Sequence, residues 1–235
     1  MNVLVIAAHP DDEVLGCGGT IARLAAAGDA VYVAVLGEGI TSRYGRREQA
    51  GANAVRALHA RSRQVAELLG VRELVSHELP DNRFDTVPLL EIVKLLEDLI
   101  ERLRPEVVFT QHGGDLNIDH VQTYRATLTA TRPMTGCPVR RLYAYEVASS
   151  TEWAFTQFDP PFHPNVFVDI EATLEMKIRA MELYETEARA FPHPRSPEAL
   201  RAMAGRWGSV AGLQAAEAFE LVRAIDGGDL RGVDV

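Results

Sequence analysis

The first twenty residues decide the fold: MNVLVIAA (residues 1–8), HPDDE (residues 9–13) and LGCGGT (residues 15–20). The first segment is a short apolar run rich in Val and Ile, which predicts a buried strand. Four polar or ionisable side chains follow it at once. Open α/β folds build their sites at the carboxyl ends of parallel strands. We therefore expect an α/β protein whose functional site begins at His9.

The HPDDE segment has the spacing of a metal site. His9 and Asp12 are three residues apart across a turn that Pro10 fixes, so both can reach one divalent metal. Asp11 lies between them and can face the water that a metal activates in hydrolysis. A simpler alternative is a helix N-terminus, with Asp11 or Asp12 as the cap and Glu13 favoured by the helix dipole. The pentapeptide alone leaves both interpretations open.

A second polar cluster, QHGGDLNIDH (residues 111–120), follows another predicted strand at residues 106–110. If the two strands are parallel neighbours, His120 lies beside His9 and Asp12. Two histidines and one carboxylate leave a position open for water, as in catalytic zinc sites. A buried structural histidine is the alternative for His120. Asp11 cannot share the metal if Asp12 does, which makes Asp11 the natural general base.

These motifs resemble those of the LmbE-like (PIG-L) de-N-acetylases, and the segments FPHPRS (residues 191–196) and AEAF (residues 216–219) are similar to the C-terminal pattern of that family. The resemblance implies a zinc-dependent hydrolase that removes acetyl groups from N-acetylglucosamine-type sugars. It implies Zn²⁺ on His9, Asp12 and His120, a position that Fe²⁺ can also occupy, and one small-molecule amino-sugar substrate.

Three residues are candidates for substrate binding. Arg43 lies in a Thr-Ser-Arg stretch and Asp81 in a Pro-Asp-Asn stretch, both similar to family segments that follow the second and third strands. Arg195 can bind a phosphate or carboxylate, because its guanidinium forms bidentate hydrogen bonds with such groups. The alternatives are a solvated loop cation for Arg43, a turn residue for Asp81, and an ion pair that holds a Pro-bounded loop for Arg195.

One position departs from the family pattern. Many members carry a His three residues before the metal His, where it stabilises the tetrahedral intermediate, and this chain has Asn117. An Asn amide can donate a hydrogen bond to an oxyanion, but it cannot act as an acid. We therefore expect Asn117 to act as a donor, or the role to pass to another histidine, with His112 and His193 as the candidates.

The rest of the chain alternates strands and helices. Strands are expected at residues 30–36, 71–77, 140–146 and 165–170, and helices at 20–27, 46–69, 88–103, from 118 onward and at 171–187, before a helix-rich tail. This alternation predicts a Rossmann-like, mainly parallel sheet covered by helices on both faces, in a single domain over residues 1–235. The glycines at 16, 18 and 19 lack the dinucleotide-binding spacing. We expect them to let a helix pack close to the sheet, which disfavours a nucleotide-cofactor oxidoreductase.

Composition narrows the class of protein. The net charge of −9 argues against non-specific binding to nucleic acid or to anionic membranes. Two cysteines without metal-ligand spacing disfavour a disulfide framework or a Cys-type zinc site. No apolar run approaches the length of a membrane span, and the N-terminus lacks a basic leader. These features predict a cytoplasmic protein.

Two other functions remain open at the level of sequence. One is an amidase that acts on another sugar-linked amide, for which an apolar tunnel beside the metal would be needed if the acyl chain is long. The other is a non-catalytic sugar-binding member of the family, which Asn117 favours and an intact Asp11 opposes. Association into a homo-oligomer is also left open.

Overall fold

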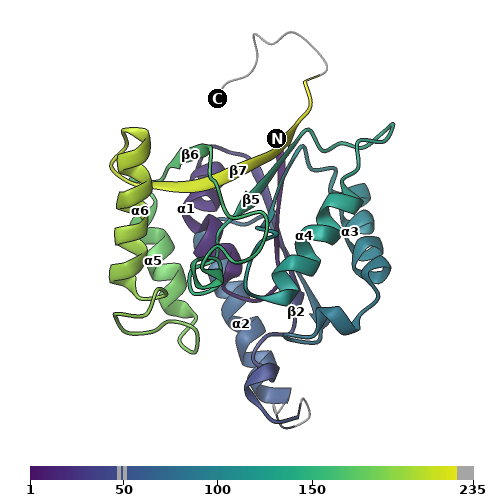
Figure 1. The fold of residues 1–235 in the computed structure, drawn as a ribbon, viewed down its shortest axis with the longest axis horizontal. Helices are drawn as coiled ribbons and strands as arrows, with labels where there is room; N and C mark the ends of the chain where they lie inside the picture. Colours follow the sequence, from purple (N-terminus) through teal and green to yellow (C-terminus); the bar gives the residue numbers. More distant parts are fainter. Residues whose placement is uncertain (47–48, 50–51, 227–235) are drawn as a thin grey trace.

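A computed structural model describes residues 1–46, 49 and 52–226. Within them, one seven-stranded sheet has the strand order β3-β2-β1-β4-β5-β7-β6 (Figure 1). Its strands are β1 (Asn2–Ala7), β2 (Ala30–Gly37), β3 (Glu73–Leu79), β4 (Val107–Gln111), β5 (Arg141–Tyr145), β6 (Val166–Asp169) and β7 (Ala216–Ala224). The expected α/β class with a mainly parallel sheet is confirmed.

The central strand β1 pairs in parallel with both β2 and β4. The register places Val3 opposite Val107 and Val5 opposite Phe109. Both strands are buried along almost their whole length, as their apolar sequences require. The carboxyl ends of β1 and β4 are therefore neighbours, and the two polar motifs that follow them meet at one edge of the sheet.

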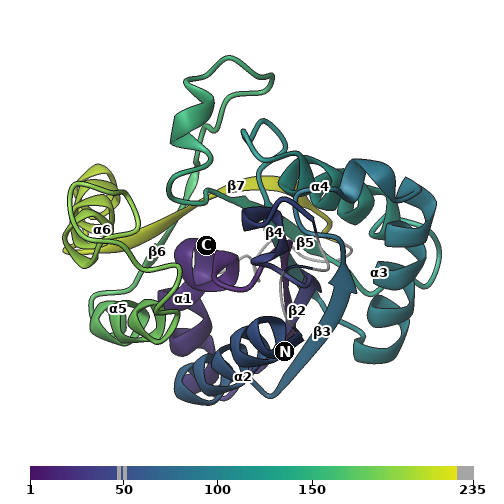
Figure 2. The ribbon, with the colours of Figure 1, turned by 90° about the horizontal axis from the view of Figure 1, so that it is seen from below.

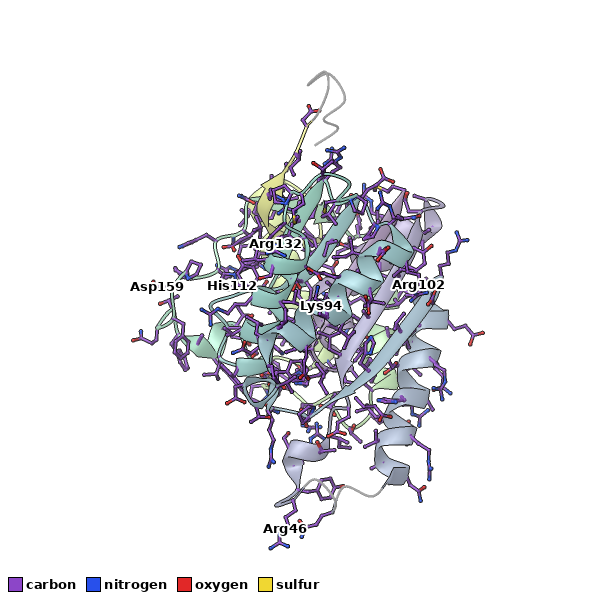
Figure 3. All side chains as sticks on the ribbon, turned by 90° about the vertical axis from the view of Figure 1, so that its right-hand side faces the viewer. Arg46, Lys94, Arg102, His112, Arg132 and Asp159 are labelled. Carbon is purple, nitrogen blue, oxygen red and sulfur yellow. The ribbon has the colours of Figure 1, made fainter. Side chains whose placement is uncertain are left out.

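Helices cover both faces of the sheet (Figure 2). On one face α1 (Asp12–Ala26) packs against α2 (Ala52–Leu69) and α5 (Leu174–Leu183), and α6 (Pro197–Ala211) packs on β6 and β7. On the other face α3 (Leu89–Leu103) packs against α4 (Ile118–Ala130). The outer side of α3 carries charged side chains such as Lys94 and Arg102 (Figure 3). None of the helices in the described ranges is both long and apolar enough to cross a membrane.

Helix α1 extends farther toward the N-terminus than the expected residues 20–27. It begins at Asp12, with Asp11 at the N-cap position and Glu13 in the first turn, as in the helix-start alternative for the HPDDE motif. Its glycines, which disfavour helix in isolation, are needed for close packing. A Cβ at Gly16 would lie 2.1 Å from the Tyr145 ring, and one at Gly19 would lie 2.8 Å from Ile170. The expectation that these glycines bring a helix close to the sheet is confirmed.

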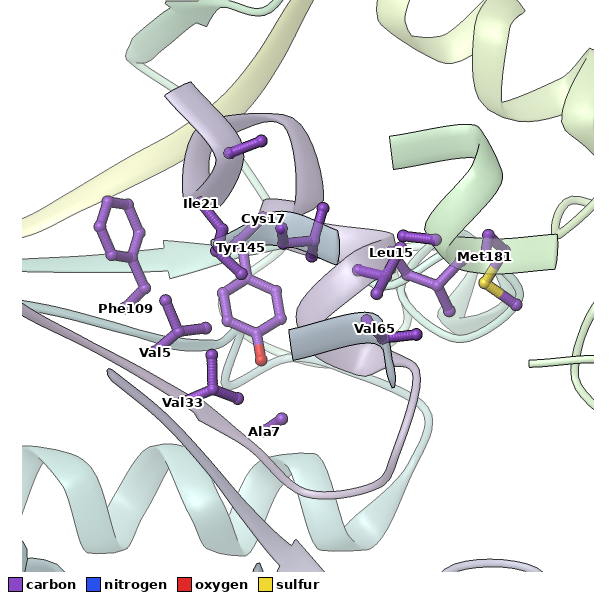
Figure 4. Packing of buried hydrophobic residues seen from close by; sticks show 14 of the residues in the cluster. Val5, Ala7, Leu15, Cys17, Ile21, Val33, Val65, Phe109, Tyr145 and Met181 are labelled. Carbon is purple, nitrogen blue, oxygen red and sulfur yellow. The ribbon is translucent and has the colours of Figure 1, made fainter. Parts of the chain in front are cut away.

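The core on the α1 face forms one cluster of buried side chains. In Figure 4, Val5 and Val33 of the sheet lie beside the ring of Tyr145, and Leu15 of α1 lies toward Met181 of α5. Tyr145 is fully buried, and its hydroxyl donates to the carbonyl of Ile6 at 2.7 Å. This packing fixes the start of α1 against the end of β1, where the site lies.

The C-terminal region contains a helix, α6, as expected of a helix-rich tail, but it continues into a strand that was not expected. Residues 216–224 form β7, which runs antiparallel between β5 and β6 and exchanges hydrogen bonds with both. Pairing along two edges outweighs the weak strand propensity of its glutamates. Helix α5 is also shorter than the predicted residues 171–187, so Glu187 lies in the turn after it. Part of the predicted start of α2, at residues 47–48 and 50–51, lies outside the described residues.

A buried ion pair joins α1, α5 and β7. Glu217 accepts the N–H groups of Gly19 and Thr20 at 2.9 and 2.7 Å. Lys177 donates from Nζ to Glu217 at 2.6 Å and to the carbonyl of Leu15 at 2.8 Å. Lys177 and Glu217 are 5% and 4% exposed. The pair ties backbone groups of α1 to two elements that are distant in sequence.

Replacing Lys177 by Met should lower the free energy of unfolding by about 3–5 kcal/mol, because Glu217 would be left buried without its cation. Urea denaturation measures the change. The matched control is Arg201→Met, which removes a cation from the exposed pair with Glu175 and should change stability little. Equal effects of the two substitutions would show that the buried pair does not secure α1.

Candidate active site

The carboxylate of Asp12 is the centre of the site. Asp12 is 1% exposed in the first turn of α1. Its Oδ2 accepts the N–H of His9 at 2.8 Å and the side-chain amide of Gln111 at 3.0 Å. His9 Nδ1 and His120 Nε2 each lie 3.3 Å from the same oxygen. The three predicted metal ligands thus offer donor atoms within 4.8 Å of one another.

Each of the two histidines has a second carboxylate behind it. His9 Nε2 lies 2.9 Å from Oδ2 of Asp119, which is fully buried at the start of α4. His120 Nδ1 lies 3.2 Å from Oδ1 of Asp115. Asp115 is itself held by the hydroxyls of Ser150 and Thr151. Metal-binding histidines usually direct their other ring nitrogen to a carboxylate in this way, which fixes the orientation of the ring.

The buried ring of His120 fits a metal. Among the described residues, neither of its nitrogens has a partner in a well-aligned hydrogen bond, although His120 is only 1% exposed and both nitrogens lie near carboxylates. A buried polar atom without an aligned hydrogen-bond partner is costly, and a metal ion would use the lone pair of Nε2. Two imidazoles and one carboxylate suit Zn²⁺, and Fe²⁺ also accepts this set. The residues present therefore fit the expected metal.

A second group of similar geometry consists of His9, Asp81 and Asp119, again within 4.8 Å. It offers one histidine only. Asp81 already accepts the N–H of Ser42 at 2.8 Å, and Asp119 accepts the N–H of Phe84 at 2.8 Å. These backbone bonds make both carboxylates better suited to orient His9 than to bind the ion.

The charges of the cluster are strongly coupled. Burial opposes ionisation of Asp12, but His120 and His9 hold its pKa well below the usual range. Burial also opposes protonation of His120, yet Asp12 and Asp115 raise its pKa to about 9. For His9, Asp119 and Asp12 overcome the effect of burial and raise the pKa well above its ordinary value. Without a metal, protons therefore occupy the imidazoles near neutral pH.

Asp11 has an unusual backbone conformation and a single strong partner. Its φ of 111° lies in a region that side-chain-bearing residues rarely adopt. Its N–H donates to Glu13 at 3.0 Å, and its Oδ2 accepts from Arg195 Nη1 at 2.6 Å. Asp11 occupies the N-cap position of α1, but its side chain makes no capping hydrogen bond. Burial raises the pKa of Asp11 well above its usual range, and Arg195 opposes that rise.

Glu187 joins the two arginines that the sequence singled out. Its Oε2 accepts from Arg43 Nη2, and it lies 3.3 Å from Arg195 Nη1. Arg195 also donates from Nε to the hydroxyl of Ser149 at 2.8 Å. The guanidinium of Arg195 therefore links Asp11, Glu187 and the loop after β5.

A cavity of about 160 Å³ opens beside His9 and Asp11. It contains all three predicted substrate-binding residues, Arg43, Asp81 and Arg195. Most of its lining is polar or charged, and the complete set is His9, Pro10, Asp11, Gly39, Ile40, Ser42, Arg43, Leu58, Asp81, Asn82, Glu187 and Arg195. A polar cavity of this kind suits a hydroxylated ligand.

Asn117 and His193 are not in the cavity lining, but each forms a hydrogen bond with a residue that is. Asn117 caps α4, because its Oδ1 accepts the N–H of Asp119 at 2.9 Å, and its Nδ2 donates to Asn82 at 3.1 Å. His193 Nδ1 accepts the N–H of Arg195 at 3.1 Å, and its ring packs edge-on against Trp153. Burial, Arg195 and Arg189 lower the pKa of His193.

His112 is held away from the cavity. Its Nε2 lies 2.8 Å from the carbonyl of Pro160, and its Nδ1 lies 3.1 Å from a carboxylate oxygen of Glu220. Its ring also contacts Phe162. These contacts connect the loop after β5 to β7, which is a structural position. Figure 3 shows His112 on the same side of the molecule as that loop.

Sequence reasoning missed three supporting residues. Gln111 and Asp115 lie in the same motif as His120, at the end of β4, so their place in that motif was an available signal. Glu187 offered none, because it reaches the site only through the turn after α5. Its partners Arg43 and Arg195 are 144 and 8 residues away.

Metal binding at pH 7.5 should release about two protons per chain, since His9 and His120 must lose their protons to bind the ion. Calorimetric titration of Zn²⁺ in buffers with different ionisation enthalpies measures this number. His120→Ala should weaken binding by orders of magnitude. A titration of the wild-type protein without proton release would contradict the assignment of these two ligands.

The chain is similar in sequence and in fold to several known proteins. The chain is 28% identical over 191 residues to the uncharacterized deacetylase YaiS of Escherichia coli K12, covering 79% of this chain and 91% of that protein. It is 30% identical over 237 residues to the 1D-myo-inositol 2-acetamido-2-deoxy-alpha-D-glucopyranoside deacetylase of Mycobacterium sp. strain JLS, covering 83% of this chain and 77% of the relative.

Among solved structures, the conserved protein TT1542 of Thermus thermophilus superposes with a TM-score of 0.74 at 27% identity and covers 97% of both chains. Residues 4–131 match the family model described as PIG-L, GlcNAc-PI de-N-acetylase. That match spans both polar motifs and more than half of the sequence. The chain therefore belongs to the PIG-L family.

Proposed function

We propose that this protein is a metal-dependent de-N-acetylase that removes the acetyl group from an N-acetylated amino sugar, with Zn²⁺ as the metal. One observation carries the proposal. The donor atoms of His9, Asp12 and His120 converge at the edge of a polar cavity that Asp11 lines. Membership of the PIG-L family and the names of the deacetylase relatives support the same reaction.

Residues of this chain supply the proton transfer and the orientation that amide hydrolysis needs beside the metal. A bound zinc ion would supply Lewis acidity, which polarises an amide carbonyl and acidifies water. Asp11 is the general base that takes a proton from the attacking water and returns it to the leaving amine. Its raised pKa makes it a stronger base than an ordinary carboxylate. Arg195, at 2.6 Å, orients the Asp11 carboxylate.

The cavity favours a sugar with a small acyl group. Side chains of Ser42, Asp81 and Asn82 on its wall are suited to hydrogen bonds with sugar hydroxyls. A long acyl chain would require an extended apolar wall, whereas the lining is mainly polar. The mycobacterial relative is named for a 2-acetamido-2-deoxy-glucopyranoside substrate, which has these features.

The test combines metal analysis with acetate release. Purified protein is incubated with N-acetylated monosaccharides, glycosides and nucleotide sugars, and acetate is quantified with and without a chelator. About one zinc ion per chain and chelator-sensitive release would support the proposal. Bound metal without acetate from any compound would argue instead for another amide or for a binding role, and a protein that takes up no metal would refute the mechanism.

Asp11→Asn should lower kcat by about 10²–10⁴-fold without changing the metal content, because it removes the base but none of the proposed ligands. Steady-state kinetics and metal analysis of the same preparation give both quantities. The control Asp29→Asn removes a carboxylate at the opposite end of the sheet, where it pairs with the N-terminus, and should leave kcat unchanged. Full activity of Asp11→Asn would rule out this base.

Asn117→Ser should lower kcat by about 10²–10³-fold with little change in KM or stability, if the Asn117 amide donates to the oxyanion. Serine can still cap α4, so the substitution removes the amide and retains the capping oxygen. Kinetics and thermal unfolding are measured together. A variant with unaltered kcat would show that Asn117 only caps the helix.

A further inference from the structure

Both arginines on the cavity wall are already neutralised by carboxylates. Arg43 pairs with Glu187, and Arg195 pairs with Asp11 at 2.6 Å and with Glu187 at 3.3 Å. Glu187 and Asp11 are 6% and 2% exposed. Because these acids are buried and in contact, the positive charge of the two guanidiniums is cancelled locally and little of it reaches a ligand.

The cavity as a whole carries more acidic than basic groups. Asp81 is a third carboxylate on its wall and is 5% exposed. Asp12 and Asp119 lie directly behind His9. Even with a divalent ion at the proposed metal site, carboxylates outnumber the positive charges around this space. An anionic ligand would therefore enter a region of unfavourable potential.

Glu187 cannot easily release the arginines to such a ligand. Its backbone N–H donates to the carbonyl of Tyr184 at 2.7 Å, and its side chain also accepts from the hydroxyl of Thr186 at 3.0 Å. Tyr184 is fully buried, which fixes this turn to the core. If an anion drew Arg43 and Arg195 away, the carboxylate of Glu187 would remain buried without a cation, which is costly.

Arg195 can nevertheless still donate a hydrogen bond to a ligand. The hydrogen bonds of Arg195 to the described residues use Nε and Nη1, so Nη2 can still donate to a ligand. A guanidinium whose charge is balanced but whose N–H groups are available suits a hydroxyl oxygen better than a phosphate. The arrangement matches the ion-pair alternative that the sequence left open for Arg195, and it differs from the anion-binding role.

We propose that the cavity selects uncharged N-acetylated sugars over sugars that carry a phosphate or carboxylate, and that Glu187 sets this selectivity by neutralising Arg43 and Arg195. The proposal rests on the proposed function, because it concerns the substrate of the same site. It excludes nucleotide sugars and sugar phosphates as preferred substrates.

The test uses two compounds that differ only in the anomeric substituent, a neutral methyl group or an anionic phosphate: methyl α-N-acetylglucosaminide and α-N-acetylglucosamine 1-phosphate. The wild-type enzyme should hydrolyse the neutral glycoside with a kcat/KM about tenfold higher or more. Glu187→Gln should reduce that ratio by about tenfold, because it frees positive charge on the two arginines. The control Glu185→Gln removes the same charge two residues away, from an exposed side chain paired with Arg61, and should leave the ratio unchanged.

Either of two kinetic results would overturn the proposal: equal or better hydrolysis of the phosphate by the wild type, or the same ratio for Glu187→Gln and Glu185→Gln. Calorimetric binding of both compounds to zinc-loaded wild-type protein tests the charge preference without any variant, should Glu187→Gln fail to fold. If neither compound releases acetate, the proposed function fails while tighter binding of the neutral glycoside still supports the selectivity. Binding of neither compound overturns the selectivity as well.

Discussion

The structure depends most on one buried carboxylate oxygen, Oδ2 of Asp12. It accepts hydrogen bonds from the N–H of His9 and the side-chain amide of Gln111, and the imidazoles of His9 and His120 each lie 3.3 Å from it. Such an oxygen is stable in the interior only because positive or polar hydrogen atoms, or a metal ion, surround it. The parallel pairing of β1 with β4 and the close contact of Gly16 with Tyr145 place these groups around it.

The carboxylates around Asp12 are stabilised in the same way, by contacts with positive or polar groups. Asp119 and Asp115 orient the two imidazoles, and Asp11 and Glu187 hold Arg195 at the cavity wall. Each acid is paired, so the site can concentrate negative charge without unpaired buried ions. This arrangement favours a divalent cation at the metal position and works against anions in the adjacent space. The metal preference and the proposed substrate preference therefore have one physical origin.

Much of this could be predicted from the sequence, because local pattern and topology were sufficient. The apolar runs and the two motifs at strand ends placed His9, Asp12 and His120 together, since neighbouring parallel strands bring their carboxyl ends to one edge. The start of α1 at Asp12 agrees with the helix N-terminus that the acidic residues of HPDDE left open, but the helical pattern was assigned only from residue 20, because Gly16 and Gly19 lower helix propensity while tertiary packing requires them. The strand β7 was missed because its pairing with β5 and β6 joins residues far apart in sequence. The series of ion pairs from Arg43 through Glu187 and Arg195 to Asp11 could not be predicted for the same reason, since Asp11 and Arg195 are 184 residues apart and no local pattern marks Glu187 as a partner of the two arginines.

The most direct test of the central claim is X-ray absorption at the zinc K-edge of the zinc-loaded protein. The account predicts two imidazole ligands and one carboxylate, with Zn–N distances of about 2.0–2.1 Å and the remaining position filled by oxygen. His120→Ala should reduce the imidazole contribution to one. A spectrum with a single imidazole in the wild type, as the group of His9, Asp81 and Asp119 would give, or with a sulfur ligand, would contradict it.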